Sequence, residues 1–106
     1  MSPDGTKYAV LYGDRDKAGS VFSYAFWMPA GVWVGGHRHN QTAHVAVLEG
    51  ELLLGFGRKM DRQKVVRVPR GGFFVVEAEE PHFEGCERDT LIVGTAMGGW
   101  RTTEFE

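Results

Sequence analysis

The sequence is divided into short apolar runs that are separated by turn-forming residues at nearly even intervals. Gly, Pro or charged residues stand between these runs, which cover residues 21–28, 32–34, 45–48, 52–54, 65–68, 73–76 and 91–93. Many short β-rich runs with regular turn signals are typical of a β-sandwich or a β-barrel. No stretch of about 11 or more residues keeps a helical period, so we expect at most one short helix, within the first 20 residues.

Length and charge narrow the class of protein further. We expect the 106 residues to form one domain, residues 1–106. The formal net charge of −2 argues against a nucleic-acid or membrane-surface partner, because both favour basic patches. The single cysteine excludes a disulfide framework and fits a reducing compartment. No signal peptide is visible, and the longest apolar runs are far shorter than the roughly 20 residues of a membrane span, so we expect a cytoplasmic protein.

The four histidines, His37, His39, His44 and His82, are the most informative polar residues. Residues two apart on a strand point to the same face, about 6.6 Å apart, so His37 and His39 can converge on one metal ion. His82 follows Pro81 at the start of another apolar run and is the expected third ligand. Because imidazole must be neutral to coordinate, we expect metal binding to fade below about pH 6–6.5.

Residues 31–50 resemble the first motif of the cupin superfamily. That motif consists of a Gly, five residues, His-x-His, three or four residues, a Glu, six residues and a Gly. In this chain Gly31 is followed by five residues and then by His37-Arg38-His39, and Gly50 ends the motif.

Residues 68–83 are similar to the second motif of the same superfamily, which runs from a Pro-x-Gly turn to a Pro-His pair. Pro69-Arg70-Gly71 begins it, and Pro81-His82 ends it. The resemblance covers about residues 21–95, and the short gap between the motifs is typical of compact single-domain members. It implies an all-β double-stranded β-helix, or jelly-roll barrel, with a metal near one mouth. This fold hosts dioxygenases, isomerases, decarboxylases, lyases, cyclases and pure binding modules.

The chain departs from the cupin pattern at two places. Ala43 stands where the family has its Glu ligand, and Glu77-Ala78-Glu79 stands where the family usually has Pro-x-Gly ahead of the Pro-His pair. The ligands carried over from the resemblance are therefore His37, His39 and His82. Three neutral ligands leave the metal its full charge and open positions, as in cupins similar in this respect, which include three-histidine iron dioxygenases that bind anionic or chelating substrates.

His44 is a further candidate metal ligand, one residue beyond the missing Glu. Strand alternation turns it to the outer face if position 43 points inward, and a bulge or register shift would bring it in. Two interpretations remain open. Either His44 completes a four-histidine site, or it faces outward, on a dimer interface.

The same alternation gives candidate cavity walls. Counting back from His37 places Gly35 and Trp33 on the ligand face, and Tyr24, Phe26 and Trp27 either line the cavity or form ordinary core. Counting forward from His82 places Glu84 and Cys86 inward. Glu84 is a candidate acid or base, an acceptor for a ligand histidine, or a rim residue. We expect Cys86 to be a small buried hydrophobe.

These residues and the resemblance predict a metal-dependent enzyme that acts on a small organic substrate, by dioxygenase-type or Lewis-acid lyase, isomerase or cyclase chemistry. The metal would be one divalent ion of Fe, Zn, Mn, Ni or Cu. The alternatives are a non-catalytic metal or small-molecule binding module and a metal-free barrel whose histidines bind substrate. A carboxylate in the cavity, Glu84 or Glu77, would favour the enzyme. The high aromatic content, 12%, and the sheet edges predict a homodimer.

Overall fold

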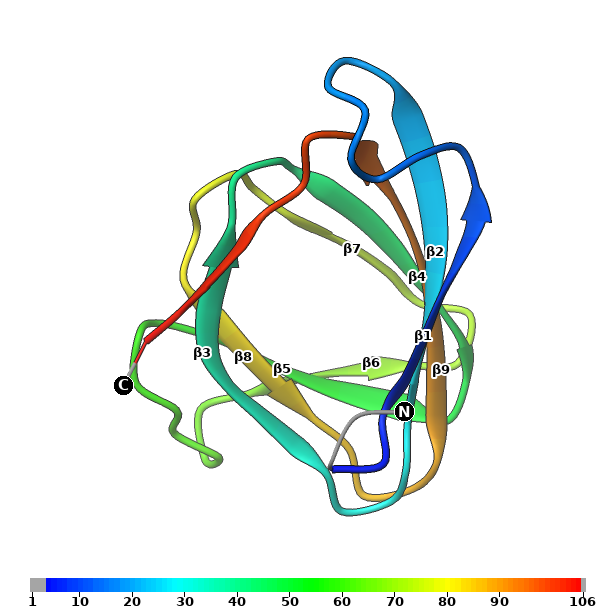
Figure 1. The fold of residues 1–106 in the computed structure, drawn as a ribbon. Coiled ribbons are helices and arrows are strands. Elements are labelled where there is room, and N and C mark those ends of the chain that lie inside the picture. The colour runs from blue at the N-terminus through cyan, green and yellow to red at the C-terminus, as the bar shows by residue number, and fades with distance from the viewer. Residues whose placement is uncertain (1–3, 106) are drawn as a thin grey trace.

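The chain forms ten strands and no helix over residues 4–105, which the computed structural model describes (Figure 1). The strands are β1 (Lys7–Tyr12), β2 (Val21–Met28), β3 (Trp33–His39), β4 (Ala43–Glu49), β5 (Glu51–Phe56), β6 (Val66–Pro69), β7 (Phe73–Val76), β8 (His82–Gly85), β9 (Thr90–Met97) and β10 (Thr102–Glu104). The all-β prediction is confirmed. Within the described residues, no helix has the length and apolar character needed to cross a membrane.

The strands pair into two five-stranded antiparallel sheets that face each other (Figure 1). The first sheet has the order β1-β2-β9-β4-β7, and the second has the order β10-β3-β8-β5-β6. Strands that are far apart in the sequence are neighbours in both sheets, as in β2 with β9 and β3 with β8. The result is the predicted double-stranded β-helix, or jelly-roll barrel.

The barrel core follows from the alternation of side chains along each strand. In β4, Ala43, Val45 and Val47 are at most 3% exposed, whereas the residues between them face outward or are half-buried. They pack with inward residues of β2, β5 and β9 in one apolar cluster. Polar residues of β3 and β8, namely His37, His82 and Glu84, are also buried inside the barrel.

The predicted short helix near the N-terminus is wrong. Residues 7–12 form β1, which pairs antiparallel with β2, with Tyr8 opposite Phe26 and Val10 opposite Tyr24. The stretch is rich in Tyr, Val and Leu, and the edge of β2 offers it a row of backbone hydrogen bonds. Its side chains are all exposed, so no alternation of apolar and polar residues marks it as a strand in the sequence.

The C-terminal strand β10 completes the second sheet beside the candidate ligands. Thr102 pairs with His39, and Glu104 pairs with His37. Beyond the strand, the Phe105 backbone N–H donates to the Gly36 carbonyl at 2.9 Å. The last described residues therefore form one wall of the barrel mouth, next to both histidines of β3.

Candidate metal centre

Three of the four histidines come together at the barrel mouth. His37 and His39 lie on β3, and His82 lies on β8 directly opposite His37 in register. The ring centroids are 4.2 Å apart for His37 and His82, 4.9 Å for His37 and His39, and 5.2 Å for His39 and His82. One ring nitrogen from each residue lies within 4.8 Å of the others. This is the grouping predicted from the two-residue spacing and the Pro-His pair.

The hydrogen bonds of the three rings determine which nitrogen remains for a ligand. Nδ1 of His37 bonds the Gly35 carbonyl at 2.8 Å, and Nδ1 of His82 bonds the Glu80 carbonyl at 3.0 Å. A carbonyl only accepts, so these Nδ1 atoms carry the proton, and Nε2 keeps the lone pair. Nδ1 of His39 is paired with the Thr102 hydroxyl at 2.9 Å. All three rings therefore leave Nε2 for coordination.

This arrangement fits a metal ion. Metal-bound histidines nearly always bond a carbonyl, carboxylate or water through the other ring nitrogen, which fixes the tautomer and the ring orientation. Two nitrogens at 2.0–2.1 Å from one zinc ion are at most about 4.2 Å apart. The observed nitrogens lie within 4.8 Å of one another, so side-chain shifts of well under 1 Å are enough to close the site.

Burial keeps two of the rings neutral. Desolvation, together with the neighbouring His37 and His82 rings, lowers the pKa of His39 to about 3. Desolvation and His37 lower the pKa of His82 to about 4, against a smaller opposing effect of the Glu80 carbonyl. The expected loss of metal near pH 6 assumed the ordinary imidazole pKa. The pKa values of His39 and His82 both lie below it. His39 and His82 therefore hold the ligand form well into the acid range.

Glu84 lies beside the cluster, deeper in the barrel. Its Oε1 is 3.7 Å from Nε2 of His37, and its side chain is 12% exposed. That separation is too long for a hydrogen bond. Burial raises the pKa of Glu84, and the nearby His37 partly offsets this. The alternation from His82 predicted this inward position, and the structure provides one buried carboxylate close to the three histidines. Glu77, the other carboxylate considered, is exposed.

The structure does not bring His44 to the other three histidines. Ala43 is 3% exposed and points into the barrel, and His44 points out, opposite Thr95 of β9. The pairing of β4 with β7 runs without a bulge from Ala43 to Ala46, so nothing turns His44 inward. Its ring lies against Phe73, with the centroids 6.0 Å apart. Of the two interpretations of His44, the geometry matches the outward one.

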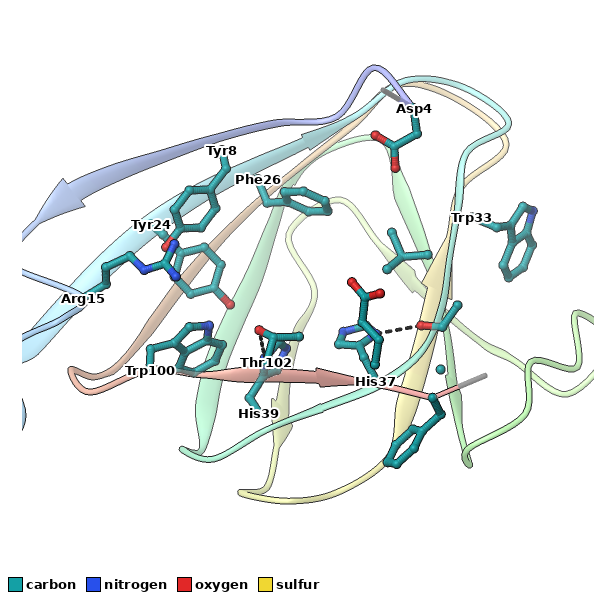
Figure 2. Close-up of a pocket in the computed structure, with 15 residues that line it drawn as sticks. Asp4, Tyr8, Arg15, Tyr24, Phe26, Trp33, His37, His39, Trp100 and Thr102 are labelled. Atoms are coloured by element: carbon teal, nitrogen blue, oxygen red, sulfur yellow. Dashed lines mark hydrogen bonds between the residues drawn. The ribbon is translucent and has the colours of Figure 1, made fainter. Parts of the chain in front are cut away.

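A cavity of about 480 Å³ opens beside His37 and His39 (Figure 2). This volume lies within the roughly 300–1,000 Å³ range of small-molecule sites. Trp100 stacks on the His39 ring at 4.3 Å between centroids, with an interplanar angle of 27°. Tyr24 and Phe26, for which cavity wall and ordinary core were both open, line the cavity and also contact the core cluster. The walls are therefore largely aromatic.

Two predicted wall residues are placed differently. Trp27 lies on the other face of β2, where the Lys7 ammonium is 5.0 Å from its ring centroid. Trp33 borders the cavity, but its indole packs over Gly85 on the side of β3 away from the histidines (Figure 2). A register shift between Val34 and His37 breaks the count by twos and turns Val34 toward the core instead.

Several residues at the cavity were not predicted from the sequence. Arg15, Trp100, Thr102 and Glu104 all line it. They lie in the loop after β1 and in the segment around β10, outside the part of the chain that resembles the cupin motifs. The contacts of Thr102 and Glu104 with β3 join residues more than sixty positions apart, and no local pattern indicates such pairings.

Comparisons with known proteins agree with this geometry at the level of the fold. No protein-family model matches the sequence, and no curated protein matches it. Among solved structures, an RmlC-like cupin protein from Desulfovibrio desulfuricans is 21% identical, with a TM-score of 0.69 over 87% of this chain and 81% of that one. A Klebsiella pneumoniae protein with a double-stranded β-helix domain is 14% identical, with a TM-score of 0.73 over 98% and 89%.

A larger protein is also similar. Salicylate 1,2-dioxygenase from Pseudoaminobacter salicylatoxidans, in a structure with gentisate, is 15% identical, with a TM-score of 0.76 over 97% of this chain. This chain spans 29% of that enzyme's length. The chain is thus a double-stranded β-helix with a three-histidine cluster at its mouth. Its fold is that of the small single-domain cupins.

Proposed function

We propose that this protein is a metal-dependent cupin enzyme that acts on a small organic substrate. His37, His39 and His82 hold one divalent transition ion, and the substrate occupies the cavity next to them. The observation that carries the proposal is the hydrogen bonding of the three Nδ1 atoms, because it leaves Nε2 of each ring for coordination in a cluster whose ring nitrogens approach within 4.8 Å.

The ligand set and the cavity support catalysis. When bound, the ion supplies Lewis acidity or, as Fe(II), activation of O₂. Three neutral imidazoles leave the charge of the ion uncompensated by its own ligands, so an oxygen of a substrate is attracted to the ion. Trp100 stacks on the His39 ring and would limit the access of water to it. Glu84 places a carboxylate next to His37, where it balances charge or exchanges a proton with a bound molecule.

The comparisons favour one narrower form of the proposal. A similar solved structure is a dioxygenase for salicylate that also has a complex with gentisate. This similarity supports dioxygenase-type chemistry ahead of Lewis-acid lyase, isomerase or cyclase chemistry. The second candidate function is a non-catalytic metal or small-molecule binding module, in which Glu84 only balances the charge of the ion.

Metal analysis followed by turnover assays tests the proposal. The protein is freed of metal with a chelator and titrated with Zn²⁺ and, without oxygen, with Fe²⁺, and we expect one ion per chain. The Fe²⁺ form is then supplied with O₂ and a panel of aromatic and aliphatic acids, and oxygen uptake is recorded. Uptake with a defined product supports the enzyme. Stoichiometric metal without turnover of any compound supports the binding module, and failure to bind either ion overturns the enzyme and the metal-binding form of the module.

The proposal includes a homodimer that forms through the outer face of the first sheet. Leu48, Phe73 and Val75 are 46%, 62% and 37% exposed on this face, next to His44. Contiguous exposed apolar side chains mark association surfaces. We expect light scattering to give the mass of two chains for the wild type and of one chain for Phe73→Glu. Val66→Glu, on the second sheet, is the matched control and should remain dimeric. A monomeric wild type at high micromolar concentration contradicts the dimer.

A further inference from the structure

The cavity beside the histidines has a cationic end that the proposed metal site does not use. Arg15, in the loop between β1 and β2, lines the same cavity as His37 and His39. Its guanidinium carbon is 5.6 Å from the centroid of the Tyr8 ring. The contact with the exposed Asp16 is 3.7 Å, beyond hydrogen-bonding distance. Figure 2 shows Arg15 next to Tyr8 and Tyr24 at one end of the cavity.

The backbone fixes the position of Arg15 relative to the histidines. The Arg15 carbonyl accepts hydrogen bonds from the N–H groups of Gly99 and Trp100, at 2.8 and 3.1 Å. A third bond, from the Gly98 N–H to the Ser20 carbonyl at 2.6 Å, joins the same two segments. Trp100 in turn stacks on His39. The loop that carries Arg15 is therefore connected to the candidate metal centre through Trp100.

Aromatic rings line the cavity between Arg15 and the histidines. Tyr8 stacks with Tyr24 at 5.7 Å, and Tyr24 lies 6.0 Å from Trp100. Gly94 allows Tyr24 this position, because a Cβ at residue 94 would lie 2.3 Å from the Tyr24 ring. Flat aromatic surfaces next to a cation favour a planar ligand with a negative group at one end.

The charges along the cavity give such a ligand one orientation. Asp4, which accepts hydrogen bonds from the N–H and hydroxyl of Thr6 at 3.0 and 2.8 Å, lies at the side of the cavity away from Arg15 (Figure 2). Glu104 of β10 also lines the cavity, next to His37 on the paired strand β3. Asp4 repels an anionic group at its side, Glu104 repels one beside His37, and Arg15 attracts it at the other end. The remainder of the ligand then points toward the histidines.

We propose that the cavity binds a small aromatic carboxylate, with its carboxylate on the Arg15 guanidinium and its ring against Tyr8, Tyr24 and Trp100. Arginine pairs with a carboxylate through two parallel hydrogen bonds, which specify both charge and orientation. This inference deepens the proposed function, since it rests on the same cavity and names the class of substrate. The binding of the carboxylate to Arg15 needs no metal.

Titration calorimetry with simple probes tests this assignment. Benzoate, cyclohexanecarboxylate and the uncharged benzamide are titrated into the metal-free and the zinc-loaded protein. We expect benzoate to bind both forms, and benzamide and cyclohexanecarboxylate to bind about 10-fold more weakly or worse. Arg15→Gln should weaken benzoate by about 10-fold or more and leave benzamide unchanged. Arg70→Gln, which removes the same charge from an exposed turn, should bind benzoate like the wild type.

The outcomes separate this inference from the proposed function. Benzoate binding that is equal in Arg15→Gln and Arg70→Gln, or no binding by the wild type at millimolar benzoate, overturns the assignment of Arg15. If Arg15-dependent benzoate binding occurs in a protein that takes up no metal, the assignment is supported and the proposed function fails. If one metal ion binds and benzoate affinity does not depend on Arg15, the assignment fails and the metal centre is supported. Circular dichroism of each variant checks that the barrel is intact.

Discussion

The four histidines lie on strands β3 and β8 of one sheet and on strand β4 of the facing sheet. The side chains on β3 and β8 point inward, and the one on β4 points outward. On β3 and β8, three rings point inward, and each has a hydrogen-bonding partner for its Nδ1 atom. On β4, the inward position is Ala43, and His44 points outward against Phe73. A shift of one residue along a strand thus separates a candidate metal ligand from a surface histidine. Whether a histidine is a candidate ligand in this barrel depends on the direction in which it faces and on the partner of its second ring nitrogen.

The largest effect expected from this comparison is on metal affinity. His82→Ala removes a ligand, so we expect it to weaken zinc binding by about 100-fold or more, since loss of a partner behind a ligand already costs roughly 10–100-fold. His44→Ala should leave the dissociation constant for zinc within about 2-fold of the wild-type value. Calorimetry on both variants measures the difference. Equal losses in the two would mean that β4 contributes a ligand and that the comparison is wrong.

The next largest effect on zinc affinity is expected from Ala43→Glu, which tests whether position 43 of β4 faces the ion. We expect the new carboxylate to reach the ion and tighten zinc binding by roughly 10-fold, because it adds a negative ligand to three neutral ones. The buried charge should lower the unfolding free energy of the metal-free variant by about 2–4 kcal/mol, and zinc should restore part of it. Weaker zinc binding would show that position 43 does not face the ion.

The pH dependence of the unfolding free energy tests the difference between His39, whose ring on β3 is largely buried, and His44, whose ring on β4 is exposed. The pKa of His39 in the fold, about 3, lies below its unfolded value, so the unfolded chain binds more protons between these values. The stabilising contribution of neutral His39 is therefore present above about pH 6.5 and is lost as the pH falls toward 3.

Urea unfolding of the metal-free protein between pH 7 and pH 4 measures this effect. The wild type should lose stability relative to His39→Gln as the pH falls, and His44→Gln should follow the wild type. Glu84, whose pKa is raised, changes stability in the opposite direction but is common to all three proteins. Parallel curves for wild type and His39→Gln would contradict the burial argument.

The smallest predicted effect concerns the turn between β7 and β8, where the chain departs from the cupin pattern. Glu79 has φ of 67°, a left-handed conformation that favours glycine, and stands where the resemblance expects Gly. Its exposed ion pair with Arg38, at 3.4 Å, contributes little. We expect Glu79→Gly to raise the unfolding free energy by about 0.5–1 kcal/mol in urea. Ala78→Gly, at a neighbouring position, should lower it, and a loss of stability in Glu79→Gly would contradict the prediction.

Much of the fold and the histidine cluster could be predicted from the sequence because both depend on local spacing. Turn residues separate the apolar runs, and the two-residue spacing places His37 and His39 on one face. His82 follows from the Pro-His pair, and Glu84 follows from alternation. These inferences hold wherever a strand keeps its register, as β4 does around Ala43.

The other parts of the fold and of the candidate site depend on features that leave no local pattern in the sequence. A register shift within β3 turned Trp33 away from the histidines, and only the pairing with β8 reveals it. Strand β1 has exposed side chains on both faces, so no periodicity marked it. Arg15 and Trp100 reach the cavity through backbone hydrogen bonds between the two ends of the chain. Backbone pairing of this kind is independent of side-chain identity and leaves no pattern in the sequence.

The carbonyls that orient His37 and His82 each lie two residues earlier in the same strand or turn. Such short-range bonds survive when the barrel mouth fluctuates, because they do not depend on a distant segment. The two rings would therefore keep their orientation if the mouth opens. An ion that binds as proposed would meet His37 and His82 already oriented, so the search over side-chain rotamers before binding would be confined to His39, whose partner Thr102 is distant in the sequence.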